Sequence, residues 1–452
     1  MSQRPPTDRP VPEVLIVGAG ICSLTLAILL EQINIPYQIF ERASVVKPLG
    51  SSMVFAGNVF PVLEQLGIYE EIKKVSNPYD KGDYYDGNLK KLGSFNVEQC
   101  KIATGYDCRV FARPRFYEIL LKRVPAHKIS FKKKVVRTEE KDGKVTIYCS
   151  DDTSYTGDIL VGADGAHSET RQNLYKNMDE KGILPKSDLE DFSIGHTTIV
   201  GVAAPSNPEK YPQLKSERCY VAALPDNQIG WGFGQQLSET DVKEIQSRNS
   251  EWGPQARDTA YAILEKYRDF PSPLGGTMGE IFDATPRDLI SKVLLEEKLF
   301  KTWHHGRTVL LGDACHKFHP AGAQGAMNAI FDAVILANGL YNMNDTSDKS
   351  ITTAFEYYSS QRYHRTEAGF NESVAMAKIM NGQANLLSYE YDYSALLKKW
   401  SERLIRNVVL NYIPSFIMDA QLRKILAYRP QVAWLPLVEN RGEGPVTPQE
   451  FK

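Results

Sequence analysis

Glycines and carboxylates at the ends of short apolar runs are the residues of this sequence best suited to chemistry. The first set is Gly18 and Gly20, which follow the apolar run Val14–Val17. Gly18 permits a tight turn, Gly20 lets a pyrophosphate approach the backbone, and the helix starting near Ile21 presents free N–H groups to the phosphates. Ser23 replaces the third glycine of such a turn and is small enough for close helix–strand packing. The pattern predicts a dinucleotide site.

A carboxylate follows this turn at the expected distance. Glu41 lies 21 residues after Gly20, at the end of a second predicted strand, Tyr37–Glu41. A carboxylate there accepts hydrogen bonds from a ribose diol and repels a 2′-phosphate, so the site favours an AMP-type ribose. The alternative is a chance glycine turn with an unrelated surface glutamate. The strand, the helix and the spacing together argue against that alternative.

Two later segments also run from a strand into a turn that carries an acid. They are Asp158–Arg171, with Asp164 in its turn, and Gly312–Ala333, with Asp313. Ligands bind beside the carboxyl ends of strands in open α/β sheets, so both acids are candidates for ligand contacts, and Asp313 can accept from a ribityl hydroxyl. The turn Gly325–Asn328 opens a helix, whose N–H groups can face the electron-rich edge of a reduced ring system.

The elements that position these residues predict an α/β fold with a Rossmann-like cofactor domain. Between Phe192 and Phe282 the pattern changes to strand-like runs separated by loops, which predicts an inserted β-sheet that could cover a pocket. Beyond Gln324 the sequence is mostly helical. We expect the cofactor domain at residues 12–190 and 286–345, the substrate-domain sheet at 191–285 and a helical C-terminal region at 346–452.

Individual elements follow from the periodicity of apolar residues. Helices are predicted over Leu24–Gln32, Asn58–Leu66, Phe116–Val124, Met327–Tyr341, Thr352–Glu367 and Tyr393–Val409. Strands are predicted over Lys144–Cys149, Ser154–Val161, Thr197–Ala203, Cys219–Leu224, Ile229–Gln235 and Thr308–Asp313.

Composition and charge limit the classes of partner. The chain has 452 residues, of which 42% are hydrophobic and 24% charged, the balance of a globular protein of two or three domains. The formal net charge of −2 gives no electrostatic reason to expect a nucleic acid partner. The six cysteines include no CxxC pair, which favours a reducing, cytoplasmic compartment without disulfides.

The sequence gives little sign of a membrane segment. No stretch approaches the ~20 uninterrupted apolar residues of a spanning helix. The polar, proline-rich lead Met1–Pro12 lacks the apolar core of a signal peptide, so we expect a short disordered segment. Leu404–Met418 is interrupted by charged and polar residues, and we favour a helix packed on the domain. The alternative is a weak membrane-surface contact through this C-terminal region, and with it a peripheral membrane location.

The three motifs, in this order and at these distances, resemble the class A flavin monooxygenases, also called the aromatic-ring hydroxylase family. The resemblance spans residues 14 to 340. Its specific parts are Gly162–Arg171 and Gly312–Asn328, because many unrelated enzymes share the glycine turn alone. Glu41–Gly50 and Arg113–Tyr117 resemble the fungal branch of secondary metabolism that modifies terpenoids, polyketides and indole alkaloids, to which the paxilline epoxidase belongs.

This resemblance implies FAD as the cofactor, with NADH or NADPH as reductant. The implied contacts are Gly18 and Gly20 at the pyrophosphate, Glu41 at the adenosine ribose, Arg42 near the adenine, Val54 facing the flavin, Arg113 at the phosphate or ribityl region, Asp164 by the pyrophosphate and the approaching nicotinamide cofactor, Asp313 at the ribityl chain, and Gly325 and Ala326 at the isoalloxazine pyrimidine end.

The implied activity is oxygen transfer. The reduced flavin would react with O₂ to give a C4a-hydroperoxide, whose distal oxygen passes to a small hydrophobic substrate such as a terpenoid, polyketide or indole compound. Hydroxylation and epoxidation both fit. The catalytic group stays unassigned, although Tyr220, His196 and Arg218 all fall in the inserted sheet.

Other activities on the same fold are less well supported. An FAD-dependent dehydrogenase or oxidase remains an alternative, whereas a halogenase would need a WxWxIP motif that the sequence lacks. A non-enzymatic binding protein, similar to the GDP-dissociation inhibitors, would lose the turn that Gly312–Asn328 keeps.

Two further patterns could suggest a metal site or a ligand pocket. His316 and His319 have HxxH spacing, but no Cys/His cluster supplies the remaining ligands, so we expect no metal. Trp231–Gly234 predicts a strand whose aromatic side chains either fill the substrate domain or form a wall over a hydrophobic ligand.

Overall fold

The described part of the chain holds all three motifs. The computed structural model describes residues 10–45, 50–85, 89–97, 101, 104–204, 207, 221–237 and 254–380. Most of the predicted lead, the predicted helix Tyr393–Val409, the segment Leu404–Met418, and the residues Arg218, Cys219 and Tyr220 lie outside these ranges. The predicted membrane-surface contact is therefore untested.

A six-stranded sheet forms the centre of the molecule, with the order β17-β18-β12-β1-β2-β8. Its strands are β1 (Val14–Val17), β2 (Tyr37–Glu41), β8 (Ile129–Phe131), β12 (Ile159–Gly162), β17 (His304–His305) and β18 (Thr308–Leu310). All neighbours pair in parallel except β17 with β18. The carboxyl ends of β1, β2, β12 and β18 therefore share one edge, as a Rossmann-like sheet requires.

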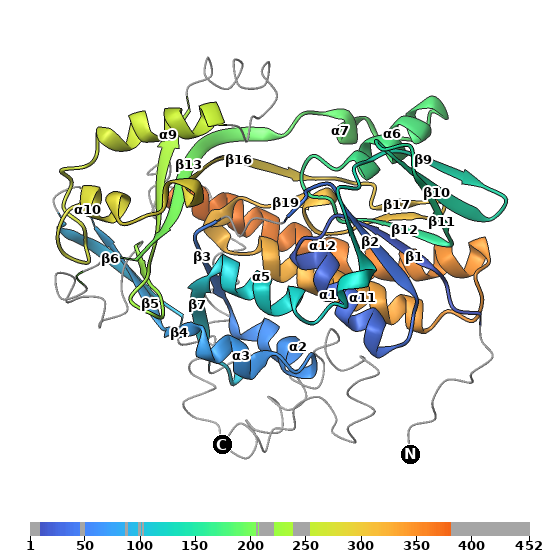
Figure 1. Cartoon of the computed structure of the whole chain (residues 1–452), viewed down its shortest axis with the longest axis horizontal. Coiled ribbons are helices and arrows are strands. Elements are labelled where there is room, and N and C mark those ends of the chain that lie inside the picture. The colour runs from blue at the N-terminus through green and yellow to red at the C-terminus, as the bar shows by residue number, and fades with distance from the viewer. Residues whose placement is uncertain are drawn as a thin grey trace, which may run out of the picture.

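Both faces of this sheet are covered, which explains why β1 is apolar at every position. Val14 and Ile16 face the main core, which contains α1 (Ile21–Gln32), α11 (Gly325–Tyr341) and α12 (Asp348–Met380). Leu15 and Val17 face the opposite way, toward a three-stranded sheet. That sheet consists of β9 (Val135–Lys141), β10 (Lys144–Cys149) and β11 (Ser154–Gly157). Figure 1 shows α1, α11 and α12 gathered beside the central sheet.

The inserted sheet has the order β14-β15-β13-β16-β19. Its strands are β13 (Ser193–Ala203), β14 (Ala222–Ala223), β15 (Ile229–Gln236), β16 (Ser291–Leu299) and β19 (His316–Lys317). β13 and β16 lie side by side and antiparallel, next to α9 (Pro254–Glu265) and α10 (Met278–Asp283) (Figure 1). The sheet thus continues past residue 285, since β16 pairs with its central strand β13, and β19 joins it to the Asp313 turn.

Smaller elements complete the described structure. The strands are β3 (Ser52–Phe55), β4 (Ser76–Tyr79), β5 (Lys81–Tyr85), β6 (Lys91–Asn96) and β7 (Cys108–Ala112), and the helices are α2 (Phe60–Gln65), α3 (Tyr69–Lys74), α5 (Arg113–Leu121), α6 (Glu169–Glu180) and α7 (Lys186–Leu189). Among the residues that the structure describes, no helix has both the length and the apolar character needed to cross a membrane.

Several predicted elements have other bounds in the structure. The range Ser154–Val161 holds two strands, β11 and β12, and Asp158 leads into the buried strand β12 as predicted. Its carboxylate accepts from the backbone N–H of Glu13 at 2.9 Å where the chain turns between the two strands. The helix predicted from Phe116 begins at Arg113, and the helix predicted over Thr352–Glu367 is only part of α12, which extends from Asp348 to Met380. Pattern reasoning places the middle of an element better than its ends.

Trp231 does not form a wall over a ligand. Its side chain is 1% exposed and packs in the core of the inserted domain, 4.9 Å from the ring of Phe282. Its indole N–H donates to Thr285 Oγ1 at 2.8 Å, which satisfies the buried donor. The aromatic-wall interpretation is therefore wrong for Trp231.

Candidate functional site

The first glycine turn packs directly against the second motif. Gly18 has a φ of +94°, and a Cβ there would lie 2.6 Å from the carbonyl oxygen of Ala163 and 2.8 Å from the Cα of Asp164. Only glycine fits this position, because the backbone is left-handed and the neighbouring turn leaves no space. The requirement at Gly18 thus comes from contact between two turns.

Gly20 is a different case, because the space around it is open. A Cβ at Gly20 would meet nothing within 4 Å. The helix α1 begins directly after it, with no side chain capping its first N–H groups and no acidic residue in its first turn. Uncapped N–H groups beside open space form a site for an anion. These features fit the pyrophosphate predicted at Gly18 and Gly20.

Glu41 reaches from the end of β2 to the glycine turn. Its Oε2 accepts from the backbone N–H of Ala19 at 2.8 Å, and its Oε1 accepts from the N–H of Ala43 at 2.8 Å. Each carboxylate oxygen can accept more than one hydrogen bond, so a ribose diol could still donate to both. Arg42, beside it, is exposed to solvent.

Asp164 supports its own turn. Its carboxylate accepts from the Ser168 hydroxyl at 2.5 Å, from the Thr170 N–H at 3.1 Å and from the Thr170 hydroxyl at 3.2 Å. Burial raises the pKa of Asp164, and these hydrogen bonds act against that increase. The hydrogen bonds of this carboxylate stabilise the turn before α6. The backbone of this turn packs against Gly18.

Arg171 connects the second motif to the third and was not predicted to do so. It is 6% exposed, and its guanidinium donates to the carbonyl oxygens of Ala166 at 2.7 Å and Ala314 at 2.9 Å. The Asp313 turn is therefore held against the Asp164 turn.

Asp313 stands at the end of β18 in an ion pair with Lys317, at 2.5 Å between Oδ2 and Nζ. Burial by itself raises the pKa of Asp313, but its interactions with nearby groups, foremost Lys317 and then His316 and Arg113, hold it below its usual value. Asp313 is thus an ionised acceptor, as a ribityl contact requires. The four-residue spacing between Asp313 and Lys317 was the sequence signal for this pair, and sequence reasoning missed it.

The start of α11 is also open. Gln324 provides no side-chain cap, and a Cβ at Gly325 would meet nothing within 4 Å. Ala326 is partly buried against the core. The uncapped N–H groups of this 17-residue helix face open space, which fits the pyrimidine end of a flavin.

The segment that contains Val54 joins this helix to the inserted sheet. The N–H of Ala56 contacts Met327 Sδ at 3.3 Å, and the hydroxyl of Ser51 donates to the carbonyl oxygens of Gly201 at 3.2 Å and Trp231 at 2.9 Å. Val54 therefore lies between the start of α11 and the inserted sheet, where the resemblance places a flavin-facing residue.

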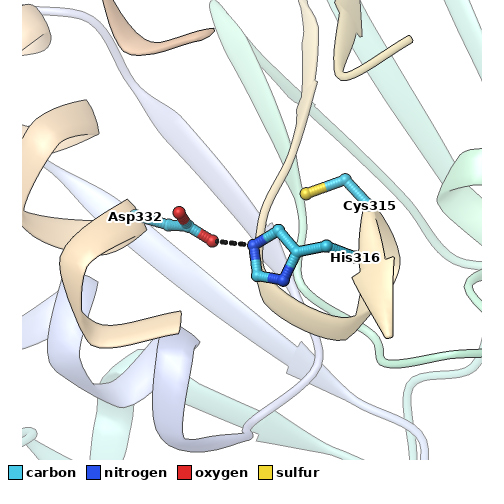
Figure 2. Close-up of side chains that lie close together, drawn as sticks. All are labelled: Cys315, His316 and Asp332. Carbon is cyan, nitrogen blue, oxygen red and sulfur yellow. Dashed lines mark hydrogen bonds and ion pairs between the residues drawn. The ribbon is translucent and has the colours of Figure 1, made fainter. Parts of the chain in front are cut away.

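Behind the Asp313 turn lies a cluster of Asp332, His316 and Arg362, which we call the Asp332 cluster. Asp332 accepts from the Gly312 N–H at 3.0 Å, pairs with His316 Nε2 at 2.5 Å and accepts from Arg362 Nε at 2.7 Å. Figure 2 shows the carboxylate of Asp332 facing the imidazole of His316, with Cys315 beside it. No feature of the sequence indicated that Arg362 would reach this position.

Cys315, His316 and Asp332 have ligand atoms within 4.8 Å of one another, as a metal site would require. The Asp332 cluster nevertheless favours a charge-balanced network, because the guanidinium of Arg362 already supplies the positive charge. Burial raises the pKa of Cys315, so the thiol keeps its proton and is a poor metal ligand. We therefore assign no metal to this cluster.

Comparison with known proteins identifies the family to which this chain belongs. The family model for an FAD binding domain matches residues 12–253 and 277–371, more than half of the chain. The chain is 31% identical over 415 residues to the FAD-dependent monooxygenase paxM of Penicillium paxilli, covering 86% of this chain and 82% of that protein. It is 30% identical over 394 residues to the FAD-dependent monooxygenase penE of Penicillium thymicola, covering 82% and 80%. The chain belongs to the FAD-dependent monooxygenases.

The fold of this monooxygenase agrees with solved structures. It matches Klebsiella pneumoniae HpxO complexed with FAD and uric acid with a TM-score of 0.64 at 21% identity, covering 87% of this chain and 95% of that one. The α/β fold with an FAD-binding domain is therefore confirmed. Family membership also argues against the non-enzymatic binding protein considered from the sequence.

Proposed function

We propose that this monooxygenase uses NADH or NADPH and O₂ to insert one oxygen atom into a small hydrophobic organic substrate, by hydroxylation or epoxidation. The redox chemistry, electron transfer from the nicotinamide and activation of O₂, is what FAD supplies when bound. The residues of the chain bind and orient the cofactor and substrate, and keep water away from the reacting atoms.

One observation carries this proposal: two uncapped helix starts and three turn carboxylates meet at one edge of the central sheet, and the inserted sheet adjoins that edge. Gly20 and Gly325 mark the open helix starts. Glu41 and Asp313 provide acceptors for the ribose and ribityl hydroxyls, and Asp164 fixes the turn beside Gly18. This arrangement fits FAD along its whole length, with Arg42 and Arg113 as further proposed contacts.

We infer the class of substrate from the side chains at the junction with the inserted sheet. Val54 and Val202 are partly buried and pack on a small apolar cluster that includes Val110 and Leu224. This cluster joins β3 and β7 to the inserted sheet, next to the start of α11. A buried apolar cluster at this junction supports the proposal of a hydrophobic ligand, such as a terpenoid, polyketide or indole compound.

The test is purification followed by spectroscopy and isotope labelling. The protein should be yellow, with the absorption spectrum of an oxidised flavin. Consumption of NADPH and NADH should rise with active members of a panel of terpenoids, polyketides and indoles, and the product should contain one ¹⁸O atom from ¹⁸O₂. Oxidation of a substrate without ¹⁸O incorporation would identify a dehydrogenase, and a colourless protein that cannot be reconstituted with FAD would refute the proposal.

A further inference from the structure

Two histidines from different parts of the fold face each other near the proposed flavin edge. His319 precedes the short 3₁₀ turn Pro320–Gly322, which leads into α11, and His196 lies on β13 of the inserted sheet. Their ring centroids are 6.0 Å apart and the ring planes are 86° from parallel. The pair spans the boundary between the cofactor domain and the inserted sheet.

The protonation of His319 follows from its hydrogen bond. The backbone N–H of Ala321 donates to Nδ1 of His319 at 3.2 Å, so Nδ1 must present a lone pair. Burial, and then the nearby His196, lower the pKa of His319 to about 4, so the ring is neutral at pH 7. A neutral imidazole carries one proton, and in His319 this proton is on Nε2.

The resulting N–H group has no acceptor in the described part of the chain. His319 is 7% exposed, and its Nε2 is buried without a hydrogen-bond partner among the described residues. His196 Nε2 is likewise buried and unpartnered there, and burial lowers the pKa of His196. A buried donor without an acceptor is unfavourable, and native proteins seldom retain one without a reason.

The position of His319 indicates where an acceptor would come from. Lys317, two residues earlier, pairs with β16, and β16 pairs with β13, which carries His196. Six residues later, Gly325 opens the helix proposed to meet the flavin. An acceptor at His319 therefore lies between the inserted sheet and the proposed flavin edge.

We propose that His319 is a positioning residue that donates a hydrogen bond from Nε2 to an oxygen atom of a bound molecule. The acceptor is a carbonyl or hydroxyl oxygen, and it belongs either to the flavin ring or to the substrate. This inference rests on the proposed function and adds a specific polar contact to the proposed site. It implies that one oxygen atom, and not shape alone, fixes the orientation of the ligand.

Two substitutions separate the donor from the rest of the side chain. His319→Asn keeps an acceptor close to the chain for the N–H of Ala321 but removes the donor at Nε2. His319→Gln restores an N–H donor at about the reach of Nε2. The matched control is His304→Asn, because His304 is a half-buried histidine on β17, with its pKa lowered by burial, whose Nε2 already has Ser359 Oγ within 3.4 Å.

The first measurement tests a flavin acceptor. FAD affinity, the flavin absorption spectrum and the reduction potential are measured for the four proteins. If the acceptor is a flavin oxygen, His319→Asn should weaken FAD binding about fivefold to tenfold and lower the potential, because a lost hydrogen bond changes a binding constant by about that factor. His319→Gln should restore both, and His304→Asn should match the wild type.

The second measurement tests a substrate acceptor on the FAD-loaded proteins. The probes are 3-acetylindole and 3-ethylindole, which have similar shapes, and only the first carries a carbonyl oxygen. If the acceptor is a substrate oxygen, the wild type should bind 3-acetylindole about fivefold to tenfold more tightly than 3-ethylindole. His319→Asn should lose this difference in affinity, while its FAD affinity and reduction potential stay unchanged.

The proposal is overturned if His319→Asn changes neither the flavin properties nor the preference between the two indoles by more than about twofold. This result differs from failure of the proposed function. If the wild type does not bind FAD, the proposed function itself is refuted. If the wild type is loaded with FAD and His319→Asn behaves like it, only the role of His319 is refuted.

Discussion

Arg362 and Asp332 form a buried ion pair across 30 residues of sequence, with 2.7 Å between Nε and Oδ1. Asp332 is 0% exposed and Arg362 is 2% exposed. A second guanidinium nitrogen of Arg362 donates to Asn328 Oδ1 at 2.6 Å. The same carboxylate accepts from the N–H of Gly312, so α12 is coupled through one side chain to the turn that carries Asp313.

Arg362→Met should destabilise the apoprotein strongly. The substitution leaves Asp332 buried without its guanidinium partner, and the loss of one member of a buried pair costs about 3–5 kcal/mol. Urea unfolding of the apoprotein measures this loss. The matched control is Arg365→Met on the exposed side of the same helix, which should change the free energy of unfolding by less than about 0.5 kcal/mol. Equal effects of the two substitutions would contradict the role of the Asp332 cluster.

Asp332 should also make stability depend on acid pH. Burial raises its pKa, but the interactions with His316 and Arg362 outweigh burial and lower it to about 2, from its ordinary value of 3.8. A lowered folded-state pKa stabilises the protein above about pH 4, and this stabilisation, of order 2 kcal/mol, is lost as the pH falls toward 2. The difference in unfolding free energy between the wild type and Asp332→Asn should therefore shrink between about pH 5 and pH 2. A constant difference would refute the ionised pair.

Asp313→Ala should abolish flavin retention while the apoprotein stays folded. The carboxylate is the proposed acceptor for the ribityl chain, and its partner Lys317 is partly exposed, so water can solvate the ammonium that is left behind. We expect at least a tenfold loss of FAD affinity, measured by fluorescence titration, with a thermal transition of the apoprotein close to that of the wild type. Asp345→Ala, at an exposed turn, is the control. Full retention of FAD by Asp313→Ala would count against the assignment.

The two glycines of the first turn should respond differently to alanine. Gly18→Ala should lower the stability of the apoprotein by about 1–3 kcal/mol, since its Cβ would collide with Ala163 and the backbone is left-handed there. Gly20→Ala should leave apoprotein stability within about 1 kcal/mol of the wild type, because nothing lies within 4 Å of its Cβ.

FAD affinity should distinguish the role of Gly20 from that of Gly18. Gly20→Ala should weaken FAD binding at least tenfold, because the added methyl group occupies the space proposed for the pyrophosphate. Unfolding and FAD titration on both variants check these outcomes together. If Gly20→Ala destabilises the apoprotein as much as Gly18→Ala does, the assignment of a structural role to Gly18 and a cofactor-binding role to Gly20 is wrong.

The sequence by itself determined the local parts of this protein. The strand Tyr37–Glu41 and the strand Lys144–Cys149 have the predicted bounds, and the glycine turn, its helix and Glu41 lie where their spacing indicated. Such features are readable because backbone conformation and hydrogen bonding within one turn depend on neighbouring residues. The resemblance to flavin monooxygenases rests on the same local motifs, and it was confirmed.

Only the tertiary structure decided which distant residues meet. Gly18 is required by the turn of Asp164, Arg362 pairs with Asp332, and His319 faces His196 across the domain boundary. β16 belongs to the inserted sheet, although the sequence pattern ended that domain before it. These contacts depend on the register of the sheets and on how α11 and α12 pack, and a single sequence without its fold carries no local signal for either.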